Sequence, residues 1–141
     1  MIDTLSGQAL DVTVVPLGIG VDIISIARVK NIIQNSGRAF LDEAFTDWEQ
    51  ERASTHPDPL AYFAITFAAK EAIFKCFGIS WETGVKLTEI EVREGKFGEP
   101  KPTLSGVFAE LARKRGVVEV LLSLSYDSEY AVGVAILVGK Q

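Results

Sequence analysis

The chain has one cysteine, one histidine and no long apolar run. The single cysteine, Cys76, excludes an intramolecular disulfide, so we expect a reducing compartment and a cytoplasmic location. The single histidine, His56, excludes a multi-histidine zinc site or a histidine-based triad within one chain. No segment approaches the roughly 18 apolar residues of a membrane-spanning helix. We therefore expect no membrane contact.

An excess of basic residues is also missing. The 141 residues carry 14 lysines and arginines against 19 aspartates and glutamates, which gives a net charge of −5. A general nucleic-acid-binding protein usually has a basic face, so we expect no nucleic-acid partner. The length and the 48% hydrophobic content fit one globular domain. We assign residues 1–15 to an N-terminal extension and residues 16–141 to a single domain.

The pattern of apolar residues predicts an α+β fold. Ser25, Thr46 and Asp58 are expected to cap helices, and Gly37 is expected to end one. Strands are expected at 17–24, 87–93, 117–126 and 130–138, the last two as a hairpin, with a glycine-rich turn at 94–100. Helices are expected at 25–36, 38–45, from Thr46, 58–77 and 105–115. This order predicts a small antiparallel sheet packed against a long central helix and shorter helices.

Glu71 is an acidic residue on the apolar stripe of the longest expected helix. It follows Phe67 by four residues and precedes Phe74 by three, so all three share one helix face. Carboxylates are rarely buried unless they are paired or bind a metal. The alternative is a surface ion pair with Lys75 one turn later. The pattern alone leaves both interpretations open.

Asp22 is a second acid, at the end of the apolar run 17–21. On its own it is better explained as a cap for the helix that follows. Together with Glu71, and with Lys70 and Lys75 nearby in sequence, it suits a site for a hard cation and a phosphate. Taken singly, Lys70 and Lys75 are better explained as solvated helix charges, and Arg28 on its own indicates nothing.

Several blocks, taken in order, resemble the holo-[acyl-carrier-protein] synthase family of small phosphopantetheinyl transferases. The first block is Gly18-Ile19-Gly20-Val21-Asp22-Ile23 with Arg28, and the most specific is Phe67 to Gly78. Ile90-Glu91-Val92 with Gly98-Glu99-Pro100 is similar to the family's middle strand and turn. Ser123-Leu124-Ser125 with Tyr130-Ala131 resembles its closing hairpin. The resemblance covers residues 17 to 138.

The resemblance implies an enzyme that moves the 4′-phosphopantetheine arm of coenzyme A to a serine of apo acyl carrier protein. The other product is adenosine 3′,5′-bisphosphate. It implies Mg²⁺ as cofactor, a homotrimer with active sites between subunits, and a carrier protein of fatty acid biosynthesis or of another pathway. Motif matching gives each candidate residue a role: Asp22 and Glu71 as metal ligands, Glu71 and Lys75 as catalytic residues, Lys70, Lys75, Gly98, Pro100 and Ser125 as coenzyme A ligands, and Arg28 as a carrier-protein contact.

The chain departs from the family pattern at three positions. A basic residue usually precedes the second motif, where this chain has Thr66. Histidine often follows the last serine of the closing hairpin, where it has Tyr126, and an expected glycine is Ser80. The first two changes predict weaker binding of coenzyme A phosphates, above all the 3′-phosphate. They favour a second hypothesis, a non-catalytic protein that binds coenzyme A or a carrier protein. A phosphohydrolase using the same acids is a third, without a recognisable nucleophile.

Overall fold

The computed structural model describes residues 14–140. Its helices are α1 (Ile26–Ser36), α2 (Arg38–Ala44), α3 (Asp47–Ser54), α4 (Pro59–Cys76) and α5 (Gly106–Lys114). Its strands are β1 (Val14–Ser25), β2 (Ile90–Glu94), β3 (Pro100–Leu104), β4 (Val117–Tyr126) and β5 (Tyr130–Lys140). Short 3-10 turns lie at Trp81–Thr83 and Leu87–Glu89. The α+β class is confirmed.

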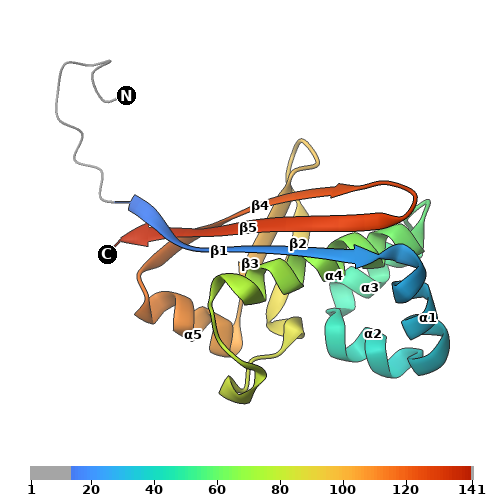
Figure 1. Cartoon of the computed structure of the whole chain (residues 1–141), viewed down its shortest axis with the longest axis horizontal. Coiled ribbons are helices and arrows are strands. Elements are labelled where there is room, and N and C mark those ends of the chain that lie inside the picture. The colour runs from blue at the N-terminus through green and yellow to red at the C-terminus, as the bar shows by residue number, and fades with distance from the viewer. Residues whose placement is uncertain (1–13, 141) are drawn as a thin grey trace.

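The strands form two antiparallel sheets. The larger has the order β1-β5-β4, so β5 is central and β1 and β4 are its edges. The smaller is the hairpin of β2 and β3, which lies beside β4 (Figure 1). In the larger sheet, Gly20 pairs with Ala135 and Asp22 with Gly133. The pairing places Asp22 on the same sheet face as these small residues, because side chains alternate along a strand.

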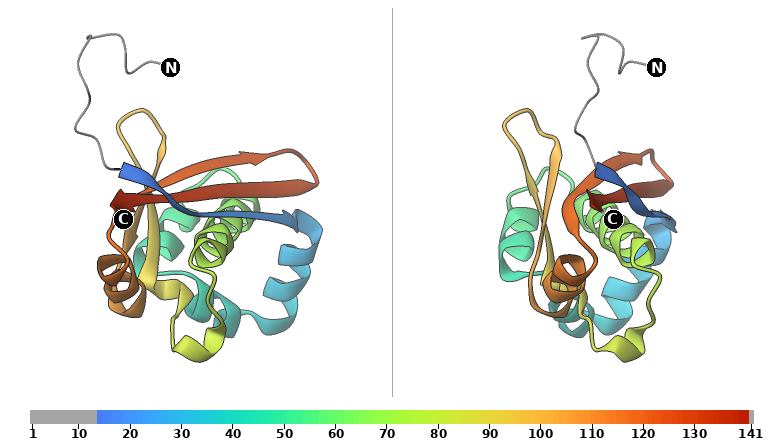
Figure 2. Two further views of the ribbon diagram at one scale, coloured as in Figure 1. Left: turned by 60° about the vertical axis from the view of Figure 1, so that its left-hand side comes forward. Right: turned by 90° about the vertical axis from the view of Figure 1, so that its left-hand side faces the viewer.

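Helix α4 packs along one face of the three-stranded sheet, and the other helices surround it on the same side (Figure 2). The main core lies between α4, the sheet, the hairpin and α5, and centres on buried Phe45, Ile73, Ile90, Phe108 and Leu137. Within residues 14–140, no helix covers the opposite face of the sheet. Nor is any helix of this part of the chain long and apolar enough to span a membrane.

The predicted helix starts are confirmed. Ser25 accepts a hydrogen bond from the Arg28 backbone N–H, Thr46 forms a capping box with Glu49, and Asp58 caps α4 ahead of Pro59. Each cap satisfies N–H groups that lack partners in the first helical turn.

Two strand starts differ from the prediction, and one strand was not predicted. Strand β1 begins at Val14, three residues before the strand start expected at 17, and residues 1–13 of the proposed extension lie outside the described residues. Residues 87–89 form a 3-10 turn, so the strand expected from 87 starts at Ile90. Strand β3 was not predicted, because Pro100 and Pro102 read as turn residues. Proline is tolerated there since β3 pairs only with β2 and is an edge strand.

Candidate functional site

Glycines let α4 approach the sheet closely enough to build the site. A Cβ atom on Gly18 would clash with the carbonyl of Cys76, one on Gly20 with the carbonyl of Ala72, and one on Gly133 with the carbonyl of Ala68. The three carbonyls are spaced four residues apart along α4. The Gly18-Ile19-Gly20 sequence therefore has a packing role: it brings β1 against α4.

This close packing brings Asp22, Glu71 and Lys75 together. The Lys75 ammonium donates to an Asp22 carboxylate oxygen at 3.0 Å and to the Val21 carbonyl at 3.1 Å. The Asp22 side chain is only 16% exposed, whereas that of Lys75 is 50% exposed. Asp22 lies within β1, and Ser25 caps α1, so the interpretation of Asp22 as a helix cap is wrong. The surface ion pair considered for Lys75 is made with Asp22 rather than with Glu71.

Glu71 lies close enough to Asp22 for their charges to interact. Burial raises the pKa of the Glu71 carboxyl, the charge of Asp22 raises it further, and Lys75 opposes both effects. The cluster thus holds two carboxylates and one ammonium, an excess of negative charge that a cation would neutralise.

The pair of acids fits a hard divalent cation as a partial ligand set. Mg²⁺ prefers oxygen ligands and is usually held by one or two carboxylates plus substrate phosphates and water. Among residues 14–140, no group of three or more His, Cys, Asp or Glu side chains is placed to hold a metal ion. Asp22 and Glu71 would therefore hold the ion only with ligands from a bound substrate, as at a phosphate-transfer site.

Glu71 also borders the largest of the cavities around the site, of about 700 Å³. Phe40, Phe67, Trp81 and Val85 supply much of its apolar lining. Trp81 stacks on Phe74 with the ring centroids 4.0 Å apart. The cavity gives a substrate or partner side chain room to reach the Glu71 carboxylate.

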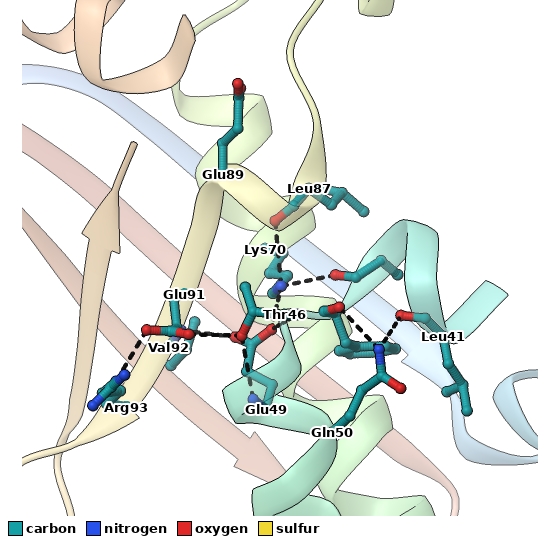
Figure 3. Close-up of polar contacts among 12 residues, drawn as sticks. Leu41, Thr46, Glu49, Gln50, Lys70, Leu87, Glu89, Glu91, Val92 and Arg93 are labelled. Atoms are coloured by element: carbon teal, nitrogen blue, oxygen red, sulfur yellow. Dashed lines mark hydrogen bonds and ion pairs between the residues drawn. The ribbon is translucent and has the colours of Figure 1, made fainter. Parts of the chain in front are cut away.

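Lys70 has a structural role, which corrects its assignment as a coenzyme A ligand. Its side chain is fully buried and pairs with the equally buried Glu49 (Figure 3). Its ammonium also donates to the carbonyls of Ala44 at 2.7 Å and Leu87 at 3.2 Å. All three ammonium protons are therefore used within the protein, and none remains for a phosphate.

Glu49 is the partner that sequence reasoning missed. Its carboxylate also accepts from the backbone N–H groups of Thr46 at 2.9 Å and Val92 at 2.8 Å. Its position in the Thr46 capping box was visible in the sequence, but that motif indicates only a helix start. Nothing in the local pattern signalled a bond to Lys70 on another helix.

A second cavity gathers other residues named from the resemblance. It has a volume of about 340 Å³ and includes Gly98, Pro100, Thr66 and Tyr126 in its lining. It lies between the β2–β3 hairpin, α4 and strand β4. Ser125 is exposed and does not line it. Two of the departures from the family pattern, Thr66 and Tyr126, are thus brought into one place by the fold.

A single chain does not bring the cluster of Asp22, Glu71 and Lys75 next to the second cavity. Asp22 lies on edge strand β1, whereas the second cavity lies at the opposite edge, β4, with β5 between them. Arg28 is exposed on α1, which directly follows β1 (Figure 1).

The chain is similar in sequence to a holo-[acyl-carrier-protein] synthase from Desulforudis audaxviator. The two are 37% identical over 123 residues, which cover 87% of this chain and 93% of that protein.

Solved structures of synthases have the same fold. The Plasmodium yoelii acyl carrier protein synthase with ADP bound superposes with a TM-score of 0.81 at 27% identity, covering 92% of this chain and 100% of that one. The Bacillus anthracis holo-(acyl-carrier-protein) synthase in complex with CoA (3′,5′-ADP) gives 0.73 at 28% identity, covering 89% and 98%.

The family model for the 4′-phosphopantetheinyl transferase superfamily matches residues 18–135. The match runs from the glycines that seat β1 on α4 to the middle of β5, so it includes both the acidic cluster and the second cavity. The chain belongs to the 4′-phosphopantetheinyl transferase superfamily.

Proposed function

We propose that this protein is a holo-[acyl-carrier-protein] synthase. It transfers 4′-phosphopantetheine from coenzyme A to a serine of apo acyl carrier protein and releases adenosine 3′,5′-bisphosphate. The names of its relatives support this activity, and so does the CoA complex of one structural neighbour. The observation that carries the proposal is the cluster of Asp22, Glu71 and Lys75, whose charges suit a diphosphate and a cation.

The reaction exchanges the phosphoanhydride bond of the coenzyme A diphosphate for a phosphoester bond to serine. The serine oxygen attacks the phosphorus that carries the pantetheine arm, and the bond from that phosphorus to the adenosine-linked phosphate breaks. A Glu71 carboxylate oxygen accepts the serine proton, and its raised pKa makes it a better base than an ordinary glutamate at neutral pH. The Lys75 ammonium, half exposed beside Asp22, binds the diphosphate and stabilises the negative charge on the leaving oxygen.

We propose Mg²⁺ as the cofactor, held by Asp22 and Glu71. The ion would neutralise charge on the diphosphate as the transfer proceeds. Asp22 is positioned for this because Gly20, two residues earlier on the same strand face, seats β1 against α4.

We further propose a homotrimer with active sites between subunits. The uncovered face of the three-stranded sheet exposes Ile19, Val21 and Ile23 by 70%, 57% and 63%, with Leu121 of β4 on the same face. Monomeric proteins rarely expose a continuous apolar surface of this kind. Packing of such faces would place one chain's β1 edge near another's β4 edge, joining the acidic cluster to the Gly98 and Pro100 cavity. The number three rests on the family resemblance.

Arg28 is proposed to contact the carrier protein. It is exposed on α1, close in sequence to Asp22, and an arginine there would attract an acidic partner to an enzyme that is itself acidic.

A cytoplasmic location is proposed because the one cysteine, Cys76, is buried and burial raises the pKa of its thiol to about 11, so that it remains an inert thiol.

The test is the intact mass of purified apo carrier protein after incubation with the enzyme, CoA and Mg²⁺. We expect a gain of one phosphopantetheine, blocked by EDTA. Asp22→Asn and Glu71→Gln should remove the gain. Glu110→Gln, which alters an exposed carboxylate paired with Arg113 away from the site, should not. Full activity in either of the first two variants would contradict the mechanism.

A non-catalytic role as a binding protein is the second candidate. The neutral side chains of Thr66 and Tyr126 in the second cavity favour it. It predicts a folded protein that binds CoA or a carrier protein in titration calorimetry but leaves the mass of several apo carrier proteins unchanged.

A further inference from the structure

The buried ammonium of Lys70 joins two segments that form walls of the 700 Å³ cavity at Glu71. It donates to the carbonyl of Ala44, the last residue of α2, and to the carbonyl of Leu87, where a 3-10 turn begins (Figure 3). Ala44 and Leu87 both line this cavity, as Glu71 does. Lys70 is fully buried and is not part of the lining. One side chain of α4 therefore holds two walls of the cavity from behind.

The wall formed by the end of α2 depends on Lys70 in two ways. The last carbonyls of a helix have no partner within the helix, and the ammonium supplies one to Ala44. The ammonium also lies 5.4 Å from the centroid of the Phe45 ring. That ring packs edge-on against Phe40, which supplies part of the apolar lining, at a centroid distance of 5.7 Å. Lys70 thus contacts both the backbone and the aromatic layer of this wall.

The two members of the buried ion pair have different contacts. The Glu49 carboxylate accepts from the backbone N–H groups of Thr46 and Val92, and neither of these residues lines the cavity. Lys70 alone of the pair bonds to the walls. Both residues contribute to stability, but only Lys70 is placed to shape the cavity. Stability and positioning can therefore be tested separately.

We propose that Lys70 is a positioning residue for the transfer reaction: by fixing Ala44 and Leu87, it sets the shape of the cavity through which the carrier-protein serine reaches Glu71. The inference rests on the proposed function, in which a Glu71 oxygen accepts the serine proton. The serine hydroxyl must then come within hydrogen-bond distance of that oxygen.

The two substrates reach Glu71 from different directions in this proposal. The diphosphate is assigned to Lys75 beside Asp22, and neither of these residues lines the cavity. The cavity is therefore left to the carrier protein. A wall displaced by about 1 Å would move the serine out of line, and misplacements of this size lower rates by up to about 100-fold. Loss of the Lys70 bonds should affect the carrier protein much more than coenzyme A.

The first experiment compares Glu49→Gln with the double variant Lys70→Met/Glu49→Gln. Glu49→Gln removes the counter-ion but leaves Lys70 with at least two N–H protons for the two carbonyls, even if the amine loses its charge. The double variant is uncharged, and both carbonyls lose their donor. Both variants should melt below the wild-type protein, since each breaks a buried ion pair or its hydrogen bonds.

The kinetics should separate the two variants. In the double variant, kcat/KM for the apo carrier protein should fall about 10- to 100-fold, with the KM for CoA within about threefold of the wild-type value. Glu49→Gln should keep both values within about threefold. Leu111→Ala is the stability control, because it weakens the core at α5 and does not line the cavity. A folded double variant with unchanged kcat/KM, or an equal loss in Glu49→Gln, would overturn the proposal.

Hydrogen exchange measured by mass spectrometry tests the walls without turnover. Well below the melting temperature, exchange in segments 42–46 and 85–89 should be faster in the double variant and unchanged in Glu49→Gln. If the wild-type protein modifies no carrier protein, the proposed function fails, whereas this comparison still decides whether Lys70 fixes the walls. Unchanged exchange in the double variant would overturn the inference.

The wild-type protein decides the matter if the double variant does not fold. The Phe45 amide bonds to the Leu41 carbonyl and the Glu89 amide to the Lys86 carbonyl, one in each wall segment. Both amides should exchange slowly if Lys70 holds the two segments. Exchange as fast as in the exposed turn at 95–98 would contradict the proposal.

Discussion

Helix α4 contributes side chains to two clusters of lysine and carboxylate groups. The clusters differ in their chemistry, although Lys70 of one and Glu71 of the other are neighbours in the sequence. Lys70 and Glu49 are both fully buried, and every proton of the ammonium has an acceptor. Glu71, Asp22 and Lys75 are partly exposed, with two acids for one base. Lys70 and Glu71 point to different sides of the same helix turn.

The difference shows how the same residue types serve structure in one place and function in another. The Lys70 cluster is complete, because its charges balance and its hydrogen bonds join α2, α3, α4 and β2 (Figure 3). The Glu71 cluster is incomplete, because one ammonium serves two carboxylates and a cation would be needed to balance the remaining negative charge. A complete cluster stabilises the fold, and an incomplete one is available to a ligand.

The largest effect should come from breaking the complete cluster. Glu49→Ala leaves the Lys70 ammonium buried without its counter-ion and the Val92 N–H without its acceptor. We expect a loss of about 3–5 kcal/mol in the free energy of unfolding, measured in urea. Glu94→Ala is the control, since its pair with Arg52 is partly exposed and should contribute at most about 1 kcal/mol. Similar losses of unfolding free energy in Glu49→Ala and Glu94→Ala would contradict the stabilising role of the Lys70 cluster.

A change in the Glu71 cluster should lower activity strongly and stability only slightly. Lys75→Met removes the ammonium that we assign to the diphosphate, so transfer activity should fall about 100- to 1,000-fold, the typical cost of losing one such donor. The free energy of unfolding should change by at most about 1 kcal/mol, because the pair with Asp22 is half exposed. On the same sample, urea titration measures the free energy of unfolding, and the rate at which the carrier protein gains mass measures the transfer activity. A large stability loss with intact activity would show that Lys75 belongs with Lys70 as a structural residue.

A third change tests how the incomplete cluster is positioned. Gly20→Ala would place a methyl group against the Ala72 carbonyl and push β1 away from α4. We expect a loss of about 1–3 kcal/mol, the usual cost of overpacking, with lower activity because Asp22 moves away from Glu71. Gly84→Ala is the contrasting variant: no atom crowds that position, so only its left-handed backbone is strained. Activity that survives in Gly20→Ala would mean that the close packing does not position Asp22.

Local sequence signals predicted the elements well and the pairings poorly. The caps at Ser25, Thr46 and Asp58 depend on a few neighbouring residues, so the sequence shows them directly. Strand β3 was missed because its two prolines are tolerated only by an edge position, which is a property of the whole sheet. The same limit applies to Lys70, whose partner Glu49 lies 21 residues away on another helix.

For the site, the resemblance selected Asp22, Glu71 and Lys75, and the structure places Asp22 beside Lys75 and within charge interaction of Glu71. Their roles as metal ligands and catalytic residues stay predictions. Pattern alone could not separate Lys70 from Lys75, because both follow the apolar stripe at helical spacing. Only the burial of one and the exposure of the other distinguish them.

The smallest expected effect is a pH dependence that arises from the unbalanced charge of Glu71. Its carboxyl has a pKa raised above the ordinary 4.5 in the folded protein, so its contribution to stability is full below pH 4.5 and is lost as the pH rises through the raised value. Glu71→Gln cannot ionise and avoids this loss. We therefore expect the variant to be the more stable of the two at pH 7 and to lose its advantage towards pH 4. Mg²⁺ at pH 7 should reduce this difference in stability, because it should stabilise the wild-type protein with Glu71 ionised. Urea titrations of both proteins at several pH values, with and without Mg²⁺, measure this. A variant less stable than wild type at pH 7 without metal would mean that the Glu71 carboxylate is already balanced within the protein, as that of Glu49 is.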